Sequence, residues 1–271
     1  MGTISVGTCG YHYNEWIGPF YPPGTRQEGF LAYYAGKFSV LELNFTYYQM
    51  PSAEQLQRMV EACGQKPGFA VKAHRTLTHD VDPAKWPDET KTYLKAIEPL
   101  RNAGRLEAVL FQFPHSFHYT ADNRRHLGRL LENFSGTPSA VEFRNAEWGN
   151  NRVIEELKKR GVAYVSTDLP DLRGLPPVLD VPTSPLAYFR LHGRNAQTWW
   201  GSDSKARYDY LYSDEELEGA AERIKRIAVK AARVLVFFNN HARGQAVRNA
   251  ETLKKILEKA GLMNGTGNSP S

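Results

Sequence analysis

The sequence predicts a single (β/α)8 TIM barrel of the α/β class, because eight short apolar runs alternate with helical patterns along 271 residues. Such a barrel uses about 250 residues, which leaves no room for a second domain. We therefore expect one barrel domain over residues 1–262 and a disordered tail over 263–271, where Gly, Asn and Ser are frequent. The eight expected strands lie in ISVGTCG, SVLELNFT, GFAVKAH, AVLFQFP, SAVEFRN, VAYVSTD, LAYFRLHG and VLVFFNNH.

Helical patterns follow most of these strands, and several begin after a typical capping residue, such as Ser52, Thr120 or Ser213. The irregular run DLPDLRGLPPVLDVPTSP replaces the sixth helix, because its prolines forbid a regular helix. Long loops also follow the first and seventh strands, at the end of the barrel where this fold carries its active sites. The expected helices are Glu28–Lys37, Ala53–Cys63, Glu89–Pro99, Asp122–Glu132, Asn150–Arg160, Asp214–Ala232 and Gly244–Ala260.

Composition narrows the class of protein further. Two cysteines are too few for a disulfide framework or a thiolate zinc site. The chain begins without the basic and apolar segments of a signal peptide, and no apolar stretch approaches the roughly 20 residues that cross a bilayer. We therefore expect a cytoplasmic protein without a membrane partner, and the sequence leaves its oligomeric state open. A net charge of +5 favours anionic partners, but the basic residues are dispersed.

Polar residues at the strand ends predict which side chains face the interior of the barrel. Side chains alternate faces along a strand, so the leucines of LELNF face the helices while Glu42 and Asn44 face inward. The eighth run, FFNNH, leaves two alternatives open, either Asn240 or the pair Asn239 and His241. The other expected inward residues are Lys72, His74, Gln112, Glu142, Arg144, Ser166, Asp168, Arg190 and His192.

This inward set is expected to form a charge-balanced ring. An isolated buried charge is very costly, so equal numbers of carboxylates and cations imply mutual pairing. A non-catalytic scaffold with a structural charge network is one interpretation. Buried ion pairs often stabilise less than apolar packing does, so ligand chemistry explains the ring better. The three carboxylates are Glu42, Glu142 and Asp168, and the three cations are Lys72, Arg144 and Arg190.

The leading functional hypothesis is an enzyme with the acid–base chemistry of a hydrolase, isomerase or lyase. Lysine and arginine suit a small anionic ligand, phosphorylated or sugar-containing, and aromatic side chains in the loops suit stacking on it. The candidate catalytic residues are Glu42, Glu142, Asp168, His192 and His74. The candidate substrate-binding residues are Asn44, Lys72, Gln112, Arg144, Arg190, Asn240, Tyr11, Trp16 and Trp199.

Two further hypotheses remain beside it. A divalent metal would be held by Glu142, Asp168 and His192, although guanidinium groups close to these carboxylates argue against it and no cofactor is required by the pattern. A nucleic-acid-binding protein or an endonuclease IV-like phosphodiesterase would use the aromatic loops and basic surface. The densest basic cluster, Arg124, Arg125, His126 and Arg129, is interpreted as a solvated helix face, with a nucleic-acid contact as the alternative.

Several motifs together carry a resemblance to a known family. The stretches GTCGYHYNEWIGPFYPPG, LELNFTYYQMPS, VKAHRTLTH, LFQFPHSF, VEFRNAEW, YFRLHGRN, RYDYLYS and FFNNHARGQAVRNA resemble the YecE-like family, also called DUF72. The resemblance runs from about Thr3 to Leu257 and implies a TIM barrel in a bacterial or archaeal-type cytoplasmic protein without an established reaction. Its relatives look similar to barrels of the xylose isomerase and endonuclease IV type. Those metal sets would have an acidic residue on the eighth strand, where this chain has Asn239, Asn240 and His241.

Overall fold

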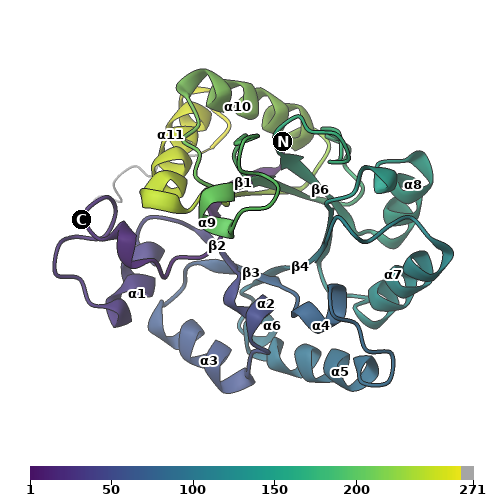
Figure 1. The fold of residues 1–271 in the computed structure, drawn as a ribbon. Coiled ribbons are helices and arrows are strands. Elements are labelled where there is room, and N and C mark those ends of the chain that lie inside the picture. Colours follow the sequence, from purple (N-terminus) through teal and green to yellow (C-terminus); the bar gives the residue numbers. More distant parts are fainter. Residues whose placement is uncertain (264–271) are drawn as a thin grey trace.

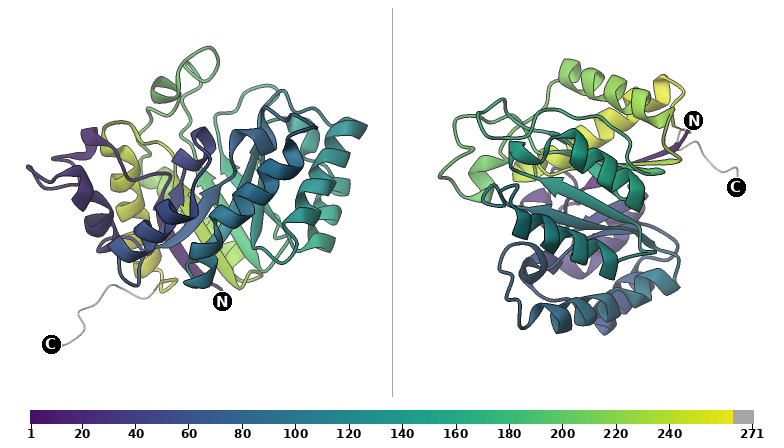
Figure 2. Two further views of the ribbon diagram at one scale, coloured as in Figure 1. Left: turned by 90° about the horizontal axis from the view of Figure 1, so that it is seen from below. Right: turned by 90° about the vertical axis from the view of Figure 1, so that its right-hand side faces the viewer.

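The computed structural model describes residues 1–263 and contains eight parallel strands that form a barrel inside a layer of helices (Figure 1). The predicted TIM-barrel fold is therefore confirmed, and residues 264–271 of the expected tail lie outside the described residues. Figure 2 shows the helices packed along the outside of the strands. The strands are β1 (Thr3–Thr8), β2 (Val40–Leu43), β3 (Gly68–Lys72), β4 (Leu106–Phe113), β5 (Ser139–Phe143), β6 (Ala163–Asp168), β7 (Leu186–Leu191) and β8 (Arg233–Phe238).

The helices follow the predicted order with a few additions. The side-chain hydroxyls of Ser52 and Thr120 accept hydrogen bonds from backbone N–H groups in the first turns of their helices, and Ser213 forms a full capping box with Glu216. Between β6 and β7, residues 169–185 contain no helix, as the prolines predict. The helices are α1 (Phe30–Ala35), α2 (Phe45–Tyr48), α3 (Ala53–Ala62), α4 (Arg75–Thr78), α5 (Trp86–Ala96), α6 (Glu98–Asn102), α7 (Ala121–Asn133), α8 (Asn151–Arg160), α9 (Ser204–Arg207), α10 (Asp214–Ala228) and α11 (Gln245–Lys259). No helix in residues 1–263 is long and apolar enough to cross a bilayer.

Short helices at the carboxyl ends of β2 and β3 were not predicted. Asn44 and His74, read from sequence as the last residues of their strands, instead precede α2 and α4. The side chain of His74 accepts a hydrogen bond from the backbone N–H of Thr76 and so caps α4. These single-turn helices are too short for a 3.6-residue pattern to show in the sequence. They matter because they place polar residues around the barrel mouth.

The barrel closes with an incomplete seam between β1 and β2. The strand order β1-β8-β7-β6-β5-β4-β3-β2 leaves these two strands as the edges of the sheet. They meet at one bridge, between Cys9 and Glu42, and the Gly10 N–H donates to the Glu42 carbonyl over 2.8 Å. At Gly7 a Cβ atom would lie 2.1 Å from the Val40 carbonyl oxygen, so only glycine permits this approach. The edges therefore touch without forming a regular ladder.

A tyrosine hydroxyl completes the seam where backbone pairing fails. The Tyr34 hydroxyl of α1 accepts a hydrogen bond from the Thr8 N–H over 2.9 Å. The same hydroxyl donates to the Val40 carbonyl over 3.1 Å. Tyr34 is fully buried, so both backbone groups would otherwise be without a partner in a dry environment. One helix side chain thus takes the place of a missing strand-to-strand bond.

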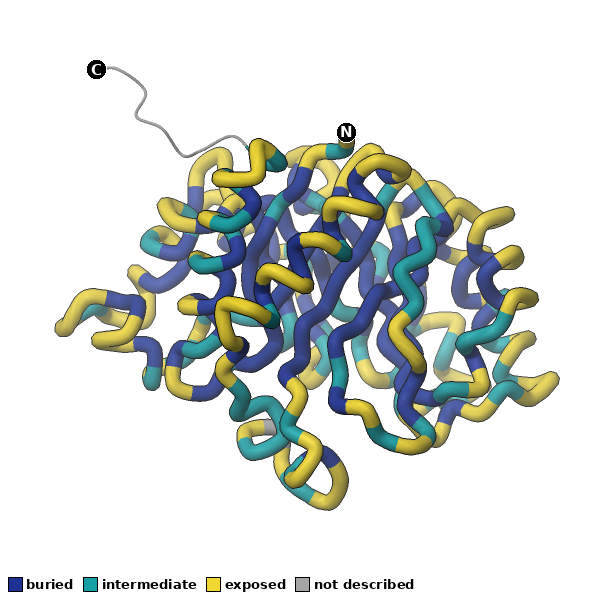
Figure 3. Tube along the Cα trace, turned by 90° about the horizontal axis from the view of Figure 1, so that it is seen from above, coloured by how far each residue is buried: buried dark blue, intermediate teal, exposed yellow. Residues whose placement is uncertain are grey.

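The barrel interior is apolar below and polar above. Figure 3 shows the strands as the most deeply buried part of the fold. The register of β7 and β8 places Tyr188 opposite Leu235 and Arg190 opposite Phe237, and alternation places Asn239 one step nearer the mouth. The lower interior is filled by Cys9, Val40, Ala70, Ala108, Leu110, Ala140, Ala163, Val165, Tyr188, Leu235 and Phe237. The polar layer therefore lies at the end of the barrel where this fold builds its sites.

Strand β6 faces the opposite way from the sequence prediction. Ala163 and Val165 pack inside the barrel, so Ser166 and Asp168 face the helices. The expectation that Ser166 and Asp168 face inward is wrong, because polar side chains on this strand find their partners on the outer face of the barrel. Asp168 can face outward because Arg194 of the loop after β7 and Arg223 of α10 pair with it there.

Candidate active site at the barrel mouth

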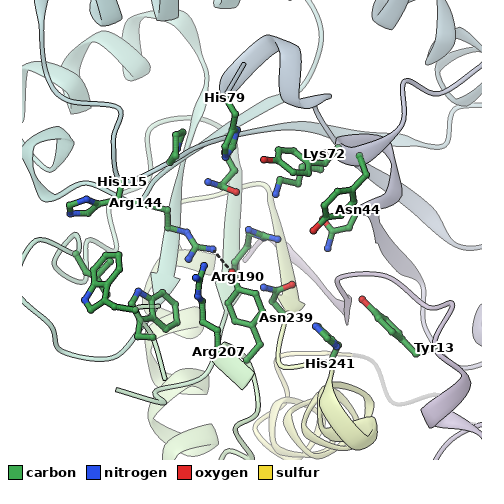
Figure 4. Close-up of a pocket in the computed structure, with 18 residues that line it drawn as sticks. Tyr13, Asn44, Lys72, His79, His115, Arg144, Arg190, Arg207, Asn239 and His241 are labelled. Carbon is green, nitrogen blue, oxygen red and sulfur yellow. Dashed lines mark hydrogen bonds between the residues drawn. The ribbon is translucent and has the colours of Figure 1, made fainter. Parts of the chain in front are cut away.

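The carboxyl ends of the strands surround a cavity of about 310 Å³ (Figure 4). Each of the eight strands supplies a lining residue through its last positions or the loop that follows. Within residues 1–263, no aspartate or glutamate lines this cavity. Its cationic and histidine side chains are Lys72, Arg144, Arg190, Arg207, His79, His115 and His241. The cavity is therefore positively charged on its surface.

Arg190 is fixed at the floor between two buried glutamates. Its Nε and Nη2 atoms donate to the two Glu42 carboxylate oxygens over 2.9 and 2.7 Å, and Nη1 donates to Glu142 over 2.7 Å. The Tyr188 hydroxyl donates to Glu42 as well, over 2.7 Å. Burial alone would lower the pKa of Arg190, but Glu142 and Glu42 raise it well above its ordinary value. Arg190 is thus a permanent cation whose donors are mostly occupied.

Glu142 lies at the centre of the network. Arg144 Nε donates to one of its oxygens, which also lies 3.2 Å from His192 Nε2. Burial alone would raise the pKa of Glu142, but Arg144, Arg190 and His192 hold it well below its ordinary range. A carboxylate that is held ionised by three donors is a weak base. We therefore expect Glu142 to orient the two arginines rather than to accept a proton from a substrate.

His192 lies beneath the cavity and does not line it. The ring is fully buried, and Asn239 Nδ2 lies 3.0 Å from His192 Nδ1. Burial and the adjacent Arg144 lower the pKa of His192 to about 3, so the ring is neutral at physiological pH. The Asn239 amide and Glu142 carboxylate together favour the tautomer with the proton on Nε2. This histidine stabilises the network instead of facing a ligand.

Lys72 and Asn44 face the cavity as the sequence predicts, together with Gln112. The Lys72 ammonium lies over the Tyr47 ring, 4.0 Å from its centroid. Burial, and next the charge of Arg190, lower the pKa of Lys72 to about 7. Figure 4 shows Lys72 on the opposite side of the pocket from Arg144, with Arg190 between them. The cavity therefore holds one amine that titrates near neutral pH.

Aromatic side chains from the loop after β7 form one wall. Trp199 is almost fully buried, and the guanidinium groups of Arg144 and Arg207 lie 5.6 and 6.0 Å from its ring centroid. Trp200 is 49% exposed beside His115, so it forms part of the rim. Trp199 was predicted as a ligand contact, and the structure places it on the cavity wall. The face of the Trp199 ring also positions the guanidinium groups of Arg144 and Arg207.

Asp168 belongs to a separate ion cluster outside the barrel. Arg194 donates to both of its oxygens over 2.8 Å, Arg223 of α10 donates over 2.8 Å, and the Tyr212 hydroxyl donates over 2.9 Å. Arg223 also pairs with Asp180 in the segment that replaces the sixth helix. Burial would raise the pKa of Asp168, but Arg194 and Arg223 hold it below its ordinary value. Asp168 therefore connects β6 to α10 and two loops.

Four other predicted site residues lie outside the cavity lining. Asn240 is fully buried and donates to the Tyr210 carbonyl and to Asn249, so the inward pair of the eighth strand is Asn239 and His241. Trp16 is also fully buried and donates to the His241 carbonyl over 2.8 Å. Tyr11 packs against the core, and His74 caps α4. Asn240 and Trp16 thus have structural contacts in place of the predicted ligand contacts.

The cavity also contains residues that the strand pattern did not reveal. His79 follows α4, while Arg207 is the last residue of α9 and Tyr208 follows it in the loop after β7. Strand alternation says nothing about such positions, because they are placed by loops and single-turn helices. The only sequence signal was the length and aromatic content of the loop after the seventh strand.

The residues present do not fit the predicted metal set. Asp168 faces the helices, so it does not meet Glu142 and His192. Glu42 and Glu142 already accept hydrogen bonds from guanidinium groups, which makes their oxygens poor ligands for a divalent cation. Nowhere in residues 1–263 do three or more His, Cys, Asp or Glu side chains converge as a ligand set. The three predicted ligands therefore form no common centre.

Known proteins resemble this chain over nearly its whole length, as its motifs predict. The UPF0759 protein YunF of Bacillus subtilis (strain 168) is 27% identical over 271 residues, which cover 94% of this chain and 95% of that protein. A crystal structure of a DUF72 family protein from Thermotoga maritima MSB8 is 36% identical, with a TM-score of 0.87 over 94% of this chain and 99% of that one. Another, from Enterococcus faecalis V583, is 26% identical, with a TM-score of 0.85 over 94% and 96% of the two chains. The family model described as "Protein of unknown function DUF72" matches residues 5–270, and the chain belongs to this family.

Proposed function

We propose that this protein is an enzyme that binds a small anionic substrate, phosphorylated or sugar-containing, in the cavity at the barrel mouth. The observation that carries the proposal is a cavity lined by Lys72, Arg144, Arg190 and Arg207 without a lining carboxylate among residues 1–263. The buried glutamates beneath it offset two of these four charges. An excess of positive charge in a partly desolvated site favours a ligand with one or two negative charges.

Buried polar atoms without a partner support the same proposal. Among the described residues, Asn44 Oδ1, Arg207 Nε and His241 Nδ1 are buried and make no hydrogen bond within the protein. All three residues line the cavity. Leaving such an atom unsatisfied costs about 1–3 kcal/mol, so a bound polar ligand would recover part of that free energy. The Asn44 oxygen is a hydrogen-bond acceptor, and the other two atoms are nitrogens of a guanidinium group and an imidazole ring. This combination suits a ligand that carries both hydroxyl and anionic oxygens.

The proton-transfer roles proposed here fall on different residues from those expected from sequence. Glu42, Glu142 and His192 support the floor, and Asp168 and His74 lie away from it. Lys72 and His79 are the titratable groups that line the cavity beside the Tyr47 ring. Burial and the charge of Lys72 lower the pKa of His79 to about 4, which makes it a neutral acceptor at pH 7. We assign acid–base chemistry to this pair.

Binding of inorganic phosphate and glucose 6-phosphate, with neutral glucose as the comparison, tests the anion pocket. Both anions should raise the melting temperature, and glucose should not. Arg144→Ala and Arg207→Ala should weaken anion binding by roughly 10- to 100-fold, because each removes a charged donor worth about 1.5–3 kcal/mol. Titration calorimetry measures these dissociation constants.

The matched control is Arg248→Ala, an exposed arginine on α11 that makes no side-chain contact with the cavity. It should bind phosphate like the unaltered protein. If Arg248→Ala and Arg207→Ala weakened phosphate binding equally, the effect would come from net charge, and the proposed anion pocket would be refuted. The same conclusion would follow if neither anion stabilised the protein at millimolar concentration.

A nucleic-acid substrate is a second candidate, favoured by a groove that continues from the cavity. A hollow of about 810 Å³ shares His79 and Pro114 with the cavity and extends along α7 past His126 and Arg129. A path that joins an anion pocket to a basic helix face suits a chain of phosphates. A polymeric ligand would use both hollows, whereas a small anion would use the cavity alone.

A further inference from the structure

Lys72 is the only lysine among the described residues that line the cavity, and it makes no ion pair there. Across residues 1–263 no carboxylate oxygen lies within 4.0 Å of its Nζ atom. The ammonium instead lies over the face of the Tyr47 ring. Glu42 and Glu142 would be the natural partners, but Arg190 and Arg144 occupy them. The amine therefore points into an accessible cavity without being held by an opposite charge.

The surroundings of Lys72 favour the neutral amine. Burial removes water from the ammonium, and Arg190 adds a nearby like charge, so the pKa falls to about 7. Glu142 and Glu42 act in the other direction, and Arg144 adds to the effect of Arg190. A lysine that is desolvated beside another cation is a nucleophile at neutral pH, because only the free base carries a lone pair. Near neutral pH, a substantial fraction of the Lys72 side chains then carries that lone pair.

We propose that Lys72 is a catalytic nucleophile that forms an imine with the carbonyl carbon of an anionic aldehyde or ketone bound in this cavity. This inference rests on the proposed anion pocket and adds the substrate class. Arg144 and Arg207 hold the anionic group beside the Trp199 wall, opposite Lys72. A cavity of about 310 Å³ has a volume that suits a carbonyl compound of a few carbons with one phosphate or carboxylate.

The step balances without a further reactant. The Nζ lone pair attacks the carbonyl carbon and forms the C–N bond, while the C=O electron pair moves onto oxygen. The two amine protons and that oxygen then leave as water, and the C=N bond forms. Nothing is oxidised or reduced. The His79 ring lies 4.8 Å from the same Tyr47 ring, centroid to centroid, and we assign to it the transfer of protons to the departing oxygen.

Pyridoxal 5′-phosphate is a suitable probe because it carries an aldehyde and a phosphate. Incubation followed by borohydride reduction should give one stable adduct, located on the Lys72 peptide by mass spectrometry. Pyridoxal, which lacks the phosphate, should need about tenfold more reagent for the same labelling. Inorganic phosphate should protect Lys72 competitively. Lys72→Arg and Lys72→Met should abolish the adduct, whereas Lys159→Arg, on an exposed face of α8, should leave it unchanged.

The outcomes separate this inference from the proposed function. Phosphate binding without a Lys72 adduct would overturn the imine and leave the anion pocket standing. An adduct spread over many lysines, unprotected by phosphate, would also overturn it. Absence of both phosphate binding and labelling would overturn the two proposals together. Because the labelling is measured on the unaltered protein, it does not depend on the folding of either Lys72 variant.

Discussion

The net charge of the candidate site depends on which carboxylates pair with which arginines. Arg190 donates to both Glu42 and Glu142, and Arg144 also pairs with Glu142. These four groups balance one another, so Lys72 supplies an additional charge at the floor. The sequence pattern predicts three carboxylates against three cations, whereas the structure has two against three because Asp168 faces outward. The correction makes the cavity more positive than the balanced ring.

Sulfate affinity should therefore depend on pH through Lys72. The pKa of Lys72 is lowered to about 7, so the ammonium is present below pH 7 and lost as pH rises above it. Sulfate keeps the same charge throughout, and its binding should weaken by about tenfold between pH 6 and pH 9. Calorimetric titration at several pH values measures this. Lys72→Arg keeps its charge and should bind with nearly constant affinity, so an equal fall in this variant would refute the assignment.

The alternation of side chains along the strands predicts part of the candidate site. Where this prediction fails, the physical reason can be identified. It places Lys72, Gln112 and Arg144 correctly in the cavity, because apolar neighbours face the helices on those strands. It fails for Asp168 and leaves the eighth strand undecided, and the polar partners of Asp168 and Asn240 lie outside the barrel. Those partners come from distant parts of the chain, so no local pattern reveals that a polar side chain can be satisfied on the outer face.

At the scale of elements, the loop after β7 completes the cavity. It supplies Trp199, Arg207 and Tyr208, and the Tyr208 hydroxyl lies 3.5 Å from Arg144 Nη2. The strands set the floor, and this loop sets the wall and the rim. The loop could be predicted from sequence as functional because of its length and its aromatic residues. The identity of the contacts depends on the path of the loop, which has no periodicity to read.

The stability of the seam between β1 and β2 should depend on one hydroxyl group of helix α1, that of Tyr34. Tyr34→Phe removes the partner of the Thr8 N–H and the Val40 carbonyl, both of which are deeply buried. We expect the free energy of unfolding to fall by roughly 1–3 kcal/mol for each unsatisfied group. Chemical denaturation at neutral pH measures this difference.

The neighbouring residue of the same helix provides the control for that substitution. Tyr33→Phe removes a hydroxyl that makes no hydrogen bond among the described residues, and Tyr33 is only partly buried. It should change the unfolding free energy by less than about 0.5 kcal/mol. If both variants unfolded at the same denaturant concentration, the hydroxyl of Tyr34 would have no role in closing the barrel.

At the scale of the whole molecule, the joined hollows allow a test of the nucleic-acid candidate. Fluorescence anisotropy with a short single-stranded DNA and RNA at about 50 mM salt should show binding that weakens steeply as salt rises. The double variant Arg125→Ala/Arg129→Ala should reduce the slope of log affinity against log salt by about 1.4, since both residues line the groove. Arg248→Ala should not. No binding at low salt would eliminate this candidate.

The overall architecture could be predicted almost completely from sequence. Strand–helix alternation, chain length and the proline-rich replacement of the sixth helix all depend on local patterns, and local patterns survive folding. The three short helices α2, α4 and α9 could not be predicted in the same way. The family resemblance indicates the same architecture, but neither it nor the strand pattern indicates a substrate.

The incomplete seam between β1 and β2 couples local opening of the barrel to loss of order in the candidate site. Glu42 joins β1 through its backbone carbonyl, which accepts from Gly10, and holds Arg190 through its carboxylate. Separating β1 from β2 would therefore displace the residue that fixes Arg190. Conversely, an anion that stabilises the floor would hold the two edges together. The weakest junction in the sheet is thus also the place where the stability of the fold and occupancy of the site are energetically linked.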